Sequence, residues 1–287
     1  MADNKDSSKN LRLGMVNFIN TAPIYIPWKE KGALAGWEIV EGNPAQLNKM
    51  LHEGKLDAGL VSSFAYGEGY PDYFLLPDFS ISAAGPVGSV LLISKEPPES
   101  LNGKKVGLTK QSATSTRLLY IILEDFWNIR PEYIPNAEHE DLHNGKCDGY
   151  MAIGDEALRL RNKWSHLHVI DLAEIWLKET GLPFVFAVWA VRQDSFLRAS
   201  NHFKQLHRHL SNCLEIGKNN LDKISSIVAP KIPMGQQECM TYLKGIEMNL
   251  NPDHQKGLKL FFSMLSKRGD LPQDVELNFI PITNEKS

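Results

Sequence analysis

The chain has 287 residues, 43% of them hydrophobic, and a net charge of −3 from 31 basic and 34 acidic residues. That length suits one large or two medium hydrophobic cores. Because no long block of like charge occurs, we expect neither nucleic acid nor a membrane surface as a partner.

The N-terminal residues and the cysteines indicate a cytoplasmic protein. Residues 1–10 lack the apolar run of about 7–15 residues that a secretory signal needs, and no window reaches the ~18 apolar residues of a membrane span. The three cysteines, Cys147, Cys213 and Cys239, are odd in number and widely spaced, as is typical of reduced thiols. A mature chain whose signal had been removed would look the same.

The first predicted unit begins with a strand at Leu11–Val16, followed by a polar turn and a helix opened by Pro23. A second helix has Asn43 as a plausible N-cap and Pro44 at its first position. It ends near Gly54, because glycine readily adopts the left-handed conformation that closes a helix. A short buried strand follows and ends at residue 61.

This unit occurs twice. The segment LHEGKLDAGLV at residues 51–61 is echoed as LHNGKCDGYMA at residues 142–152. The earlier strand, turn and helix are echoed by a strand at Lys105–Leu108 and an apolar helix over residues 118–126. The duplication predicts two similar α/β lobes with mixed, mainly parallel sheets and a ligand cleft between them.

Two apolar segments, residues 87–93 and 184–191, suit crossings between the lobes. We therefore predict lobe 1 at residues 1–94 and 186–287, which includes helices near the C-terminus. Lobe 2 is predicted at residues 95–185, inserted into lobe 1.

Small polar residues follow the predicted strands, where open parallel sheets bind ligands. They are Asn20 and Thr21, Ser62 and Ser63, Ser112, Thr114 and Ser115, and Gly154 and Asp155. Helix N-termini at these turns offer free N–H groups and the positive end of a dipole, which suits an anion. Helix capping is the alternative for each residue taken singly.

Six stretches in order resemble the chorismate dehydratase family of the futalosine pathway of menaquinone biosynthesis. They are VNFINTAP (16–23), LDAGLVSS (56–63), SISAAGPVGSV (80–90), LTKQSATS (108–115), IGDEAL (153–158) and TGLPFVFAVW (180–189). Each motif is weak alone, but together they run from about residue 11 to residue 189. The C-terminal helices are less diagnostic.

The resemblance implies a two-lobed periplasmic-binding-protein-like fold of type II. It also implies an enzyme that eliminates water from chorismate to give 3-[(1-carboxyvinyl)oxy]benzoate, without a cofactor. Asn20 and Ser89 match the family's cleft-facing positions, where they orient the substrate and assist proton transfer or departure of hydroxide. Gly85, in the same motif as Ser89, is predicted to bind substrate. The alternatives are an N-cap for Asn20 and a small residue beside the cleft for Ser89.

The group that takes the proton stays open. Asp155 is the only carboxylate of these motifs expected at the cleft, and it would need a raised pKa to act as a base. A carboxylate of the substrate is the alternative, which we prefer. Arg117 could pair with a substrate carboxylate or face solvent, and Trp176 could reach the cleft or belong to the core.

The pattern HExxH at His139–His143 is typical of zinc proteases. Here it occupies the same place in the duplicated unit as residues 48–52, so we interpret it as a solvated helix face and expect no metal.

Two other functions stay open: a non-catalytic solute-binding or sensor protein of the same fold, and the sister enzyme 1,4-dihydroxy-6-naphthoate synthase. The segment GPVGS at residues 85–89 favours the dehydratase. The expected partner is a small carboxylate, and the chain could act as a monomer or a homodimer.

Overall fold

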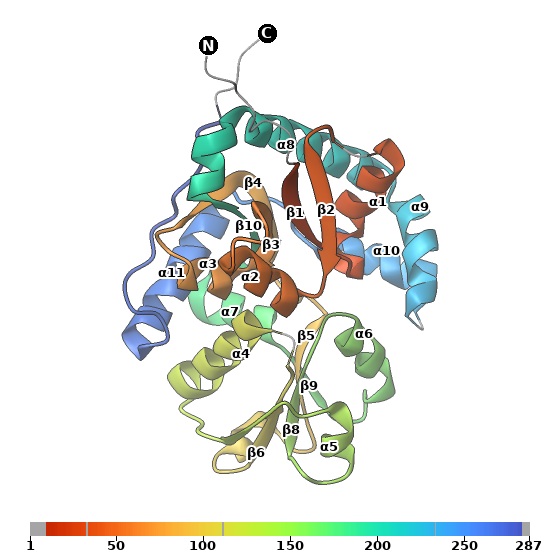
Figure 1. Ribbon diagram of the computed structural model, residues 1–287. Helices are drawn as coiled ribbons and strands as arrows, with labels where there is room; N and C mark the ends of the chain where they lie inside the picture. Colours follow the sequence, from red (N-terminus) through yellow and green to blue (C-terminus); the bar gives the residue numbers. More distant parts are fainter. Residues whose placement is uncertain (1–9, 33, 111, 233, 283–287) are drawn as a thin grey trace, which may run out of the picture.

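The computed structural model describes residues 10–282 except residues 33, 111 and 233. It has two lobes, each built around a five-stranded sheet (Figure 1). The first sheet lies in the upper lobe of Figure 1 and the second in the lower lobe.

The first sheet has the strand order β2-β1-β3-β10-β4. β1 is parallel to β2 and β3, whereas β10 is antiparallel to β3 and β4. The strands are β1 (Leu11–Val16), β2 (Trp37–Gly42), β3 (Ala58–Ser62), β4 (Tyr73–Ala83) and β10 (Phe184–Arg192).

The second sheet has the order β7-β6-β8-β5-β9 and the same pattern of directions. Its strands are β5 (Val90–Ser94), β6 (Lys105–Leu108), β7 (Glu132–Pro135), β8 (Gly149–Ile153) and β9 (His168–Asp171). β6, β7 and β8 therefore correspond to β1, β2 and β3, and β5 corresponds to β10. The duplication seen in the sequence is a duplication of topology, and each sheet is mixed because one strand enters it antiparallel to its neighbours.

The sheet pairing differs from the predicted lobe boundaries. β5 lies within residues 1–94, yet it pairs with β8 and β9 in the second sheet. Phe184 and Val185 lie within the range predicted for lobe 2, yet they pair with β4 in the first sheet. Both strands are largely buried, and a continuous apolar run does not reveal which sheet a strand joins. We therefore place the crossings at residues 84–89 and 181–183.

The repeated helix ends explain why both copies turn directly into a buried strand. In α2 (Pro44–His52), the Asn43 side chain accepts a hydrogen bond of 2.9 Å from the Gln46 N–H. Gly54 follows this helix with φ of 68°, and Gly145 follows α5 (His139–His143) with φ of 73°. Side chains with a Cβ are disfavoured at such angles, so glycine is required at both turns.

The other helices cover the sheets and the edges of the pocket. In the first lobe they are α1 (Ala22–Lys31), α3 (Ser63–Glu68), α8 (Gln193–Asn219), α9 (Leu221–Val228), α10 (Gln236–Gly245) and α11 (Pro252–Arg268). In the second lobe they are α4 (Ala113–Tyr120), the π-helix η3 (Ile121–Phe126), α6 (Gly154–Lys163) and α7 (Leu172–Thr180). Figure 1 shows α8 and α1 at the top of the first lobe and α4 and α6 facing it from below.

One buried apolar cluster runs through both lobes. It includes Leu13 and Val188 of the first sheet and Met151 of the second, whereas a smaller cluster around Tyr150 fills the other side of the second sheet. Apolar contacts therefore join the two lobes.

Candidate functional site

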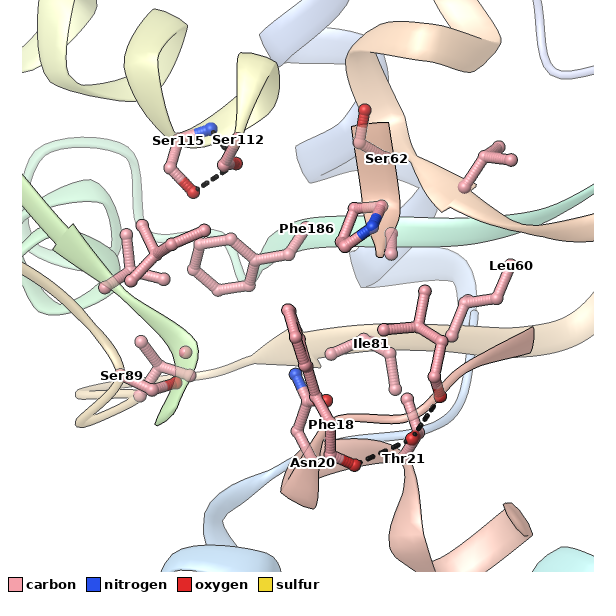
Figure 2. Close-up of a pocket in the computed structure, with 18 residues that line it drawn as sticks. Phe18, Asn20, Thr21, Leu60, Ser62, Ile81, Ser89, Ser112, Ser115 and Phe186 are labelled. Atoms are coloured by element: carbon pink, nitrogen blue, oxygen red, sulfur yellow. Dashed lines mark hydrogen bonds between the residues drawn. The ribbon is translucent and has the colours of Figure 1, made fainter. Parts of the chain in front are cut away.

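A pocket lies between the lobes, where turns after the parallel strands of both sheets meet (Figure 2). About 690 Å³ of space in this pocket is not filled by protein atoms, and part of that space is open to solvent. It is lined by Val16, Phe18, Asn20, Thr21, Pro44, Leu60, Val61, Ser62, Ile81, Val87, Ser89, Val90, Ser112, Ser115, Ile153, Gly154, Phe186 and Ala187.

The turn after β1 supplies Asn20 and Thr21 to this lining. The Thr21 hydroxyl lies 2.7 Å from the carbonyl oxygen of Val16 and 2.8 Å from that of Phe18, and these contacts hold the short helix η1 (Ile19–Thr21) against the strand. The Asn20 side-chain oxygen is buried and has no hydrogen-bond partner within the part of the chain that the structure describes. Because buried acceptors are nearly always satisfied, this oxygen is available to a ligand donor.

The two serines after β3 point in different directions. Ser62 lines the pocket and caps α3, accepting a hydrogen bond of 3.3 Å from the Ala65 N–H. Ser63 is fully buried outside the lining, and its hydroxyl donates to the Val185 carbonyl oxygen at 2.6 Å. Ser63 therefore ties α3 to β10.

The residues at the start of α4 also differ in whether they line the pocket. Ser112 caps α4, accepting from the Ser115 N–H at 3.0 Å and donating to the Ser115 hydroxyl at 2.8 Å, and both serines line the pocket. Capping and pocket lining are thus compatible in one residue. Thr114 lies outside the lining, and its Oγ1 accepts a hydrogen bond of 2.9 Å from the backbone N–H of Phe64 in the first lobe.

Ser89 lines the pocket from the segment that enters β5. Its side chain accepts a hydrogen bond of 3.0 Å from the Tyr242 hydroxyl, and its backbone oxygen accepts one of 2.7 Å from the Gly154 N–H. Burial raises the pKa of Tyr242 well above its usual range, so the phenol is a neutral donor. Sequence reasoning missed Tyr242 because α10 carries no recognisable motif and the residue lies 153 positions from its partner.

The two predicted glycines have different surroundings. Gly154 opens α6 with φ of 56° and lines the pocket, and a Cβ there would lie 3.6 Å from the Phe18 ring. Gly85 has φ of 147° and lies outside the lining. Its conformation serves the turn between β4 and β5.

Asp155 lies next to the pocket but outside its lining. Burial raises the pKa of the Asp155 carboxyl, and a hydrogen bond from the Ile19 N–H, followed by the charges of Arg159 and Lys231, partly offsets that effect. Because Ile19 belongs to the first lobe, Asp155 joins the lobes beside Asn20.

Arg117 and Trp176 do not line the pocket. The Arg117 guanidinium lies 4.2 Å from the centre of the Phe64 ring, and its Nε is 3.7 Å from the Asp270 carboxylate. Trp176 is fully buried and packs edge-on against Phe184. Both side chains contact neighbouring residues outside the pocket lining.

All the residues that line the pocket have uncharged side chains, within the described part of the chain. Figure 2 shows the rings of Phe18 and Phe186 among the hydroxyl groups of the lining. The helices α3, α4 and α6 begin at or next to residues of this lining. Helix N-termini favour negative charge, and aromatic rings favour a flat apolar group. The pocket therefore suits a planar anion.

Neither a metal-binding cluster nor a membrane-spanning helix occurs among the described residues. Among residues 10–282, leaving aside the three positions not described, no group of three or more His, Cys, Asp or Glu side chains is arranged to hold a metal ion. His139 of the HExxH pattern contacts Glu140 at 3.1 Å and Glu156 at 3.3 Å. None of the described helices combines the length and apolar character needed to cross a membrane.

The fold and the pocket define a two-lobed α/β protein of the periplasmic-binding-protein-like class. The structure is similar to the periplasmic aliphatic sulphonate-binding protein SsuA from Escherichia coli, with a TM-score of 0.70, 14% identity, and coverage of 98% of this chain and 95% of that chain. It is also similar to the alkanesulfonate-binding protein SsuA from Xanthomonas axonopodis pv. citri bound to MOPS, with a TM-score of 0.68, 15% identity, and coverage of 93% and 95%. At these identities the likeness shows the fold alone.

The chain belongs to the menaquinone biosynthesis family, whose family model matches residues 11–267. A chorismate dehydratase from Thermus thermophilus is 30% identical over 268 residues, covering 88% of this chain and 94% of that protein. A chorismate dehydratase from Campylobacter jejuni subsp. jejuni is 31% identical over 188 residues, covering 64% of this chain and 69% of that protein.

Proposed function

We propose that the protein is a chorismate dehydratase of menaquinone biosynthesis, a hydro-lyase that forms 3-[(1-carboxyvinyl)oxy]benzoate and water. The observation that carries this proposal is an uncharged, hydroxyl-lined pocket between the lobes, in a chain that matches a chorismate dehydratase over 94% of that protein's length. We further propose that it acts in the cytoplasm without a cofactor, as a monomer or homodimer.

The reaction balances without an oxidant or a reductant. A base takes the ring proton from the carbon that bears the enolpyruvyl ether, and the electron pair of that C–H bond becomes a ring double bond. The C–O bond to the neighbouring hydroxyl breaks, and the departing hydroxide acquires a proton to become water. Because the ring becomes aromatic, the protein needs only to hold the dianion, exclude solvent and stabilise the departing charge.

We assign Asn20 and Ser89 to the reacting part of the substrate. The Asn20 oxygen, buried and without a partner among the described residues, suits the substrate hydroxyl as a donor and so orients the leaving group. Ser89 contributes a hydroxyl that can donate a hydrogen bond to oxygen as it leaves. Removing one such donor typically lowers the rate by roughly 10²–10³.

We assign Ser62, Ser112 and Ser115 to the substrate carboxylates, since they lie at helix starts where anions are favoured. Because Ser112 donates its proton to Ser115, the Ser115 hydroxyl is the one of this pair that can donate to a carboxylate. Thr21 and Gly154 shape the wall of the pocket. Four other residues of the predicted binding set lie outside the lining: Ser63, Gly85, Thr114 and Asp155.

A carboxylate of the substrate is our proposed base. The lining supplies no carboxylate, imidazole or amine among the described residues, and Asp155 is engaged by the Ile19 N–H. The substrate carries two carboxylates into the pocket, so one of them can take the proton while neutral donors stabilise the other.

The test is to mix purified protein with chorismate and follow the substituted benzoate by absorbance and mass. Formation of a product lighter by one water supports the proposal, and a Ser89→Ala variant that binds chorismate but turns it over slowly links the reaction to this pocket. Bound chorismate that is never converted would instead support a solute-binding or sensor protein. Absence of binding would favour the sister naphthoate synthase activity, with another substrate.

A further inference from the structure

We propose that Tyr242 is a positioning residue for Ser89, holding the serine hydroxyl so that its proton faces the substrate. This inference rests on the proposed dehydratase function and on the role assigned there to Ser89. It brings a residue from the C-terminal helices into the reaction although that residue does not line the pocket.

The direction of one hydrogen bond carries the inference. The Tyr242 O–H donates to the Ser89 Oγ at 3.0 Å, and both groups are buried. A serine hydroxyl has one proton, so an Oγ that accepts from tyrosine keeps that proton for another acceptor. Within the described chain no such acceptor is recorded for Ser89, and Ser89 borders the pocket.

The two side chains border different cavities. Ser89 belongs to the inter-lobe pocket, whereas Tyr242 lines a separate surface recess together with Gly88 and Arg161. Tyr242 therefore contacts the Ser89 hydroxyl without itself lining the inter-lobe pocket.

The backbone around Ser89 is already fixed. The Gly88 N–H donates to the Asp171 carboxylate at 2.5 Å, and the Ser89 carbonyl accepts from the Gly154 N–H at 2.7 Å. The remaining freedom is rotation of the serine side chain and its hydroxyl, which the bond to Tyr242 restricts. Loss of such alignment slows reactions without removing any group that touches the substrate.

The charges around Tyr242 agree with a donor role. Burial raises the pKa of its phenol, as does the charge of Asp155, whereas Ser89 and Arg161 lower it. An ionised phenolate would accept from Ser89 and turn the serine proton away from the pocket. Keeping the phenol neutral therefore keeps the serine proton directed at the substrate.

A double-mutant cycle tests the inference. Tyr242→Phe should lower kcat by about 10- to 100-fold, with KM and chorismate binding changed by less than about threefold. In the Ser89→Ala background the same substitution should change kcat by less than about twofold, because nothing remains to be positioned. Single-turnover measurements with excess enzyme keep the slow variants measurable.

Tyr66→Phe is the matched control. Tyr66 is a fully buried tyrosine whose hydroxyl donates to the Glu276 carbonyl oxygen at 2.9 Å, and it does not line the pocket. Its loss should lower thermal stability but leave kcat unchanged. The inference is overturned if Tyr242→Phe lowers kcat equally in both backgrounds, or leaves kcat unchanged while the variant is folded. Failure of the proposed function itself would appear differently, as wild-type protein that forms no product.

Discussion

Thr114 of the second lobe accepts a hydrogen bond of 2.9 Å from the backbone N–H of Phe64 in the first lobe. Phe64 is the second residue of α3, where a backbone N–H has no partner within its own helix. Thr114 is 1% exposed, so the bond is shielded from water. The start of one lobe's helix is thereby completed by a side chain of the other lobe, and separation of the lobes would break this bond.

Thr114→Val should loosen this contact while keeping the side-chain shape. We expect the free energy of unfolding to fall by about 1–3 kcal/mol, because a buried N–H is left without an acceptor, and the KM for chorismate to rise. Chemical denaturation and steady-state kinetics measure the two effects. The control is Thr241→Val, where an exposed threonine bonds within its own helix at 3.0 Å and should change little. Equal effects of the two substitutions would argue against a lobe contact at Thr114.

Arg268 provides a second contact between the lobes. It ends α11 of the first lobe, and its guanidinium lies 2.8 Å from Glu124 and 2.7 Å from Asp125 of the second lobe. Only 18% of its side chain is exposed, so water screens these pairs less than ordinary surface pairs.

Arg268→Gln should favour an open arrangement. We expect a KM for chorismate raised by up to about tenfold, which corresponds to about 1.4 kcal/mol, and a larger radius of gyration without substrate. X-ray scattering with and without chorismate measures the opening. Lys256→Gln is the control, since Lys256 pairs with Asp253 of the same helix at 2.8 Å and is 66% exposed. A radius unchanged by Arg268→Gln would mean that apolar contacts alone hold the lobes.

The features that could be predicted from the sequence are those that depend on a residue and its neighbours along the chain. Asn43 before Pro44 caps a helix, and Gly54 and Gly145 end one, because these conformations depend on the residue itself and its neighbours. The duplication was visible for the same reason, since each copy repeats local signals. The placement of β5 in the second sheet was not, because it depends on strands far along the chain.

The predicted pocket residues also differ in whether their roles depend on neighbouring residues or on distant segments. Ser112 and Ser115 lie three positions apart, at the cap and third residue of α4, and so share the face that meets the pocket. Thr114, between them, points to the other lobe. Reading the turn by helical position would have separated these roles. By contrast, the bond between Tyr242 and Ser89 joins two distant segments and has no local signal.

Asn20→Ala should separate activity from stability. The Asn20 oxygen is buried without a partner among the described residues, so its removal relieves a desolvated acceptor and should leave the free energy of unfolding equal or higher. We expect kcat/KM for chorismate to fall by roughly 10²–10³. Asn43→Ala is the control with the opposite pattern of effects. It should lower the free energy of unfolding by about 1 kcal/mol through the lost helix cap and leave kcat/KM unchanged. A marked loss of stability in Asn20→Ala would indicate a structural role.

Asp155→Asn distinguishes the two candidate bases. If a substrate carboxylate takes the proton, the variant should keep kcat within about tenfold of wild type, a change of about 1.4 kcal/mol in the barrier. The asparagine oxygen can still accept the Ile19 N–H, so the contact between the lobes is preserved. A loss of several orders of magnitude with chorismate binding intact would identify Asp155 as the base.

The same variant should alter the pH dependence of stability with a definite sign. Because burial raises the pKa of Asp155 in the folded protein, ionising this carboxyl costs more in the folded state than in the unfolded state. Below the ordinary aspartate pKa of about 3.9 the group is neutral in both states and adds no such cost. As the pH rises through the folded pKa, wild type loses stability that the asparagine variant keeps. Thermal unfolding should therefore show Asp155→Asn at least as stable as wild type at pH 7, with the difference shrinking towards pH 4. A variant less stable at pH 7 would mean that the charges of Arg159 and Lys231 outweigh the cost of burial.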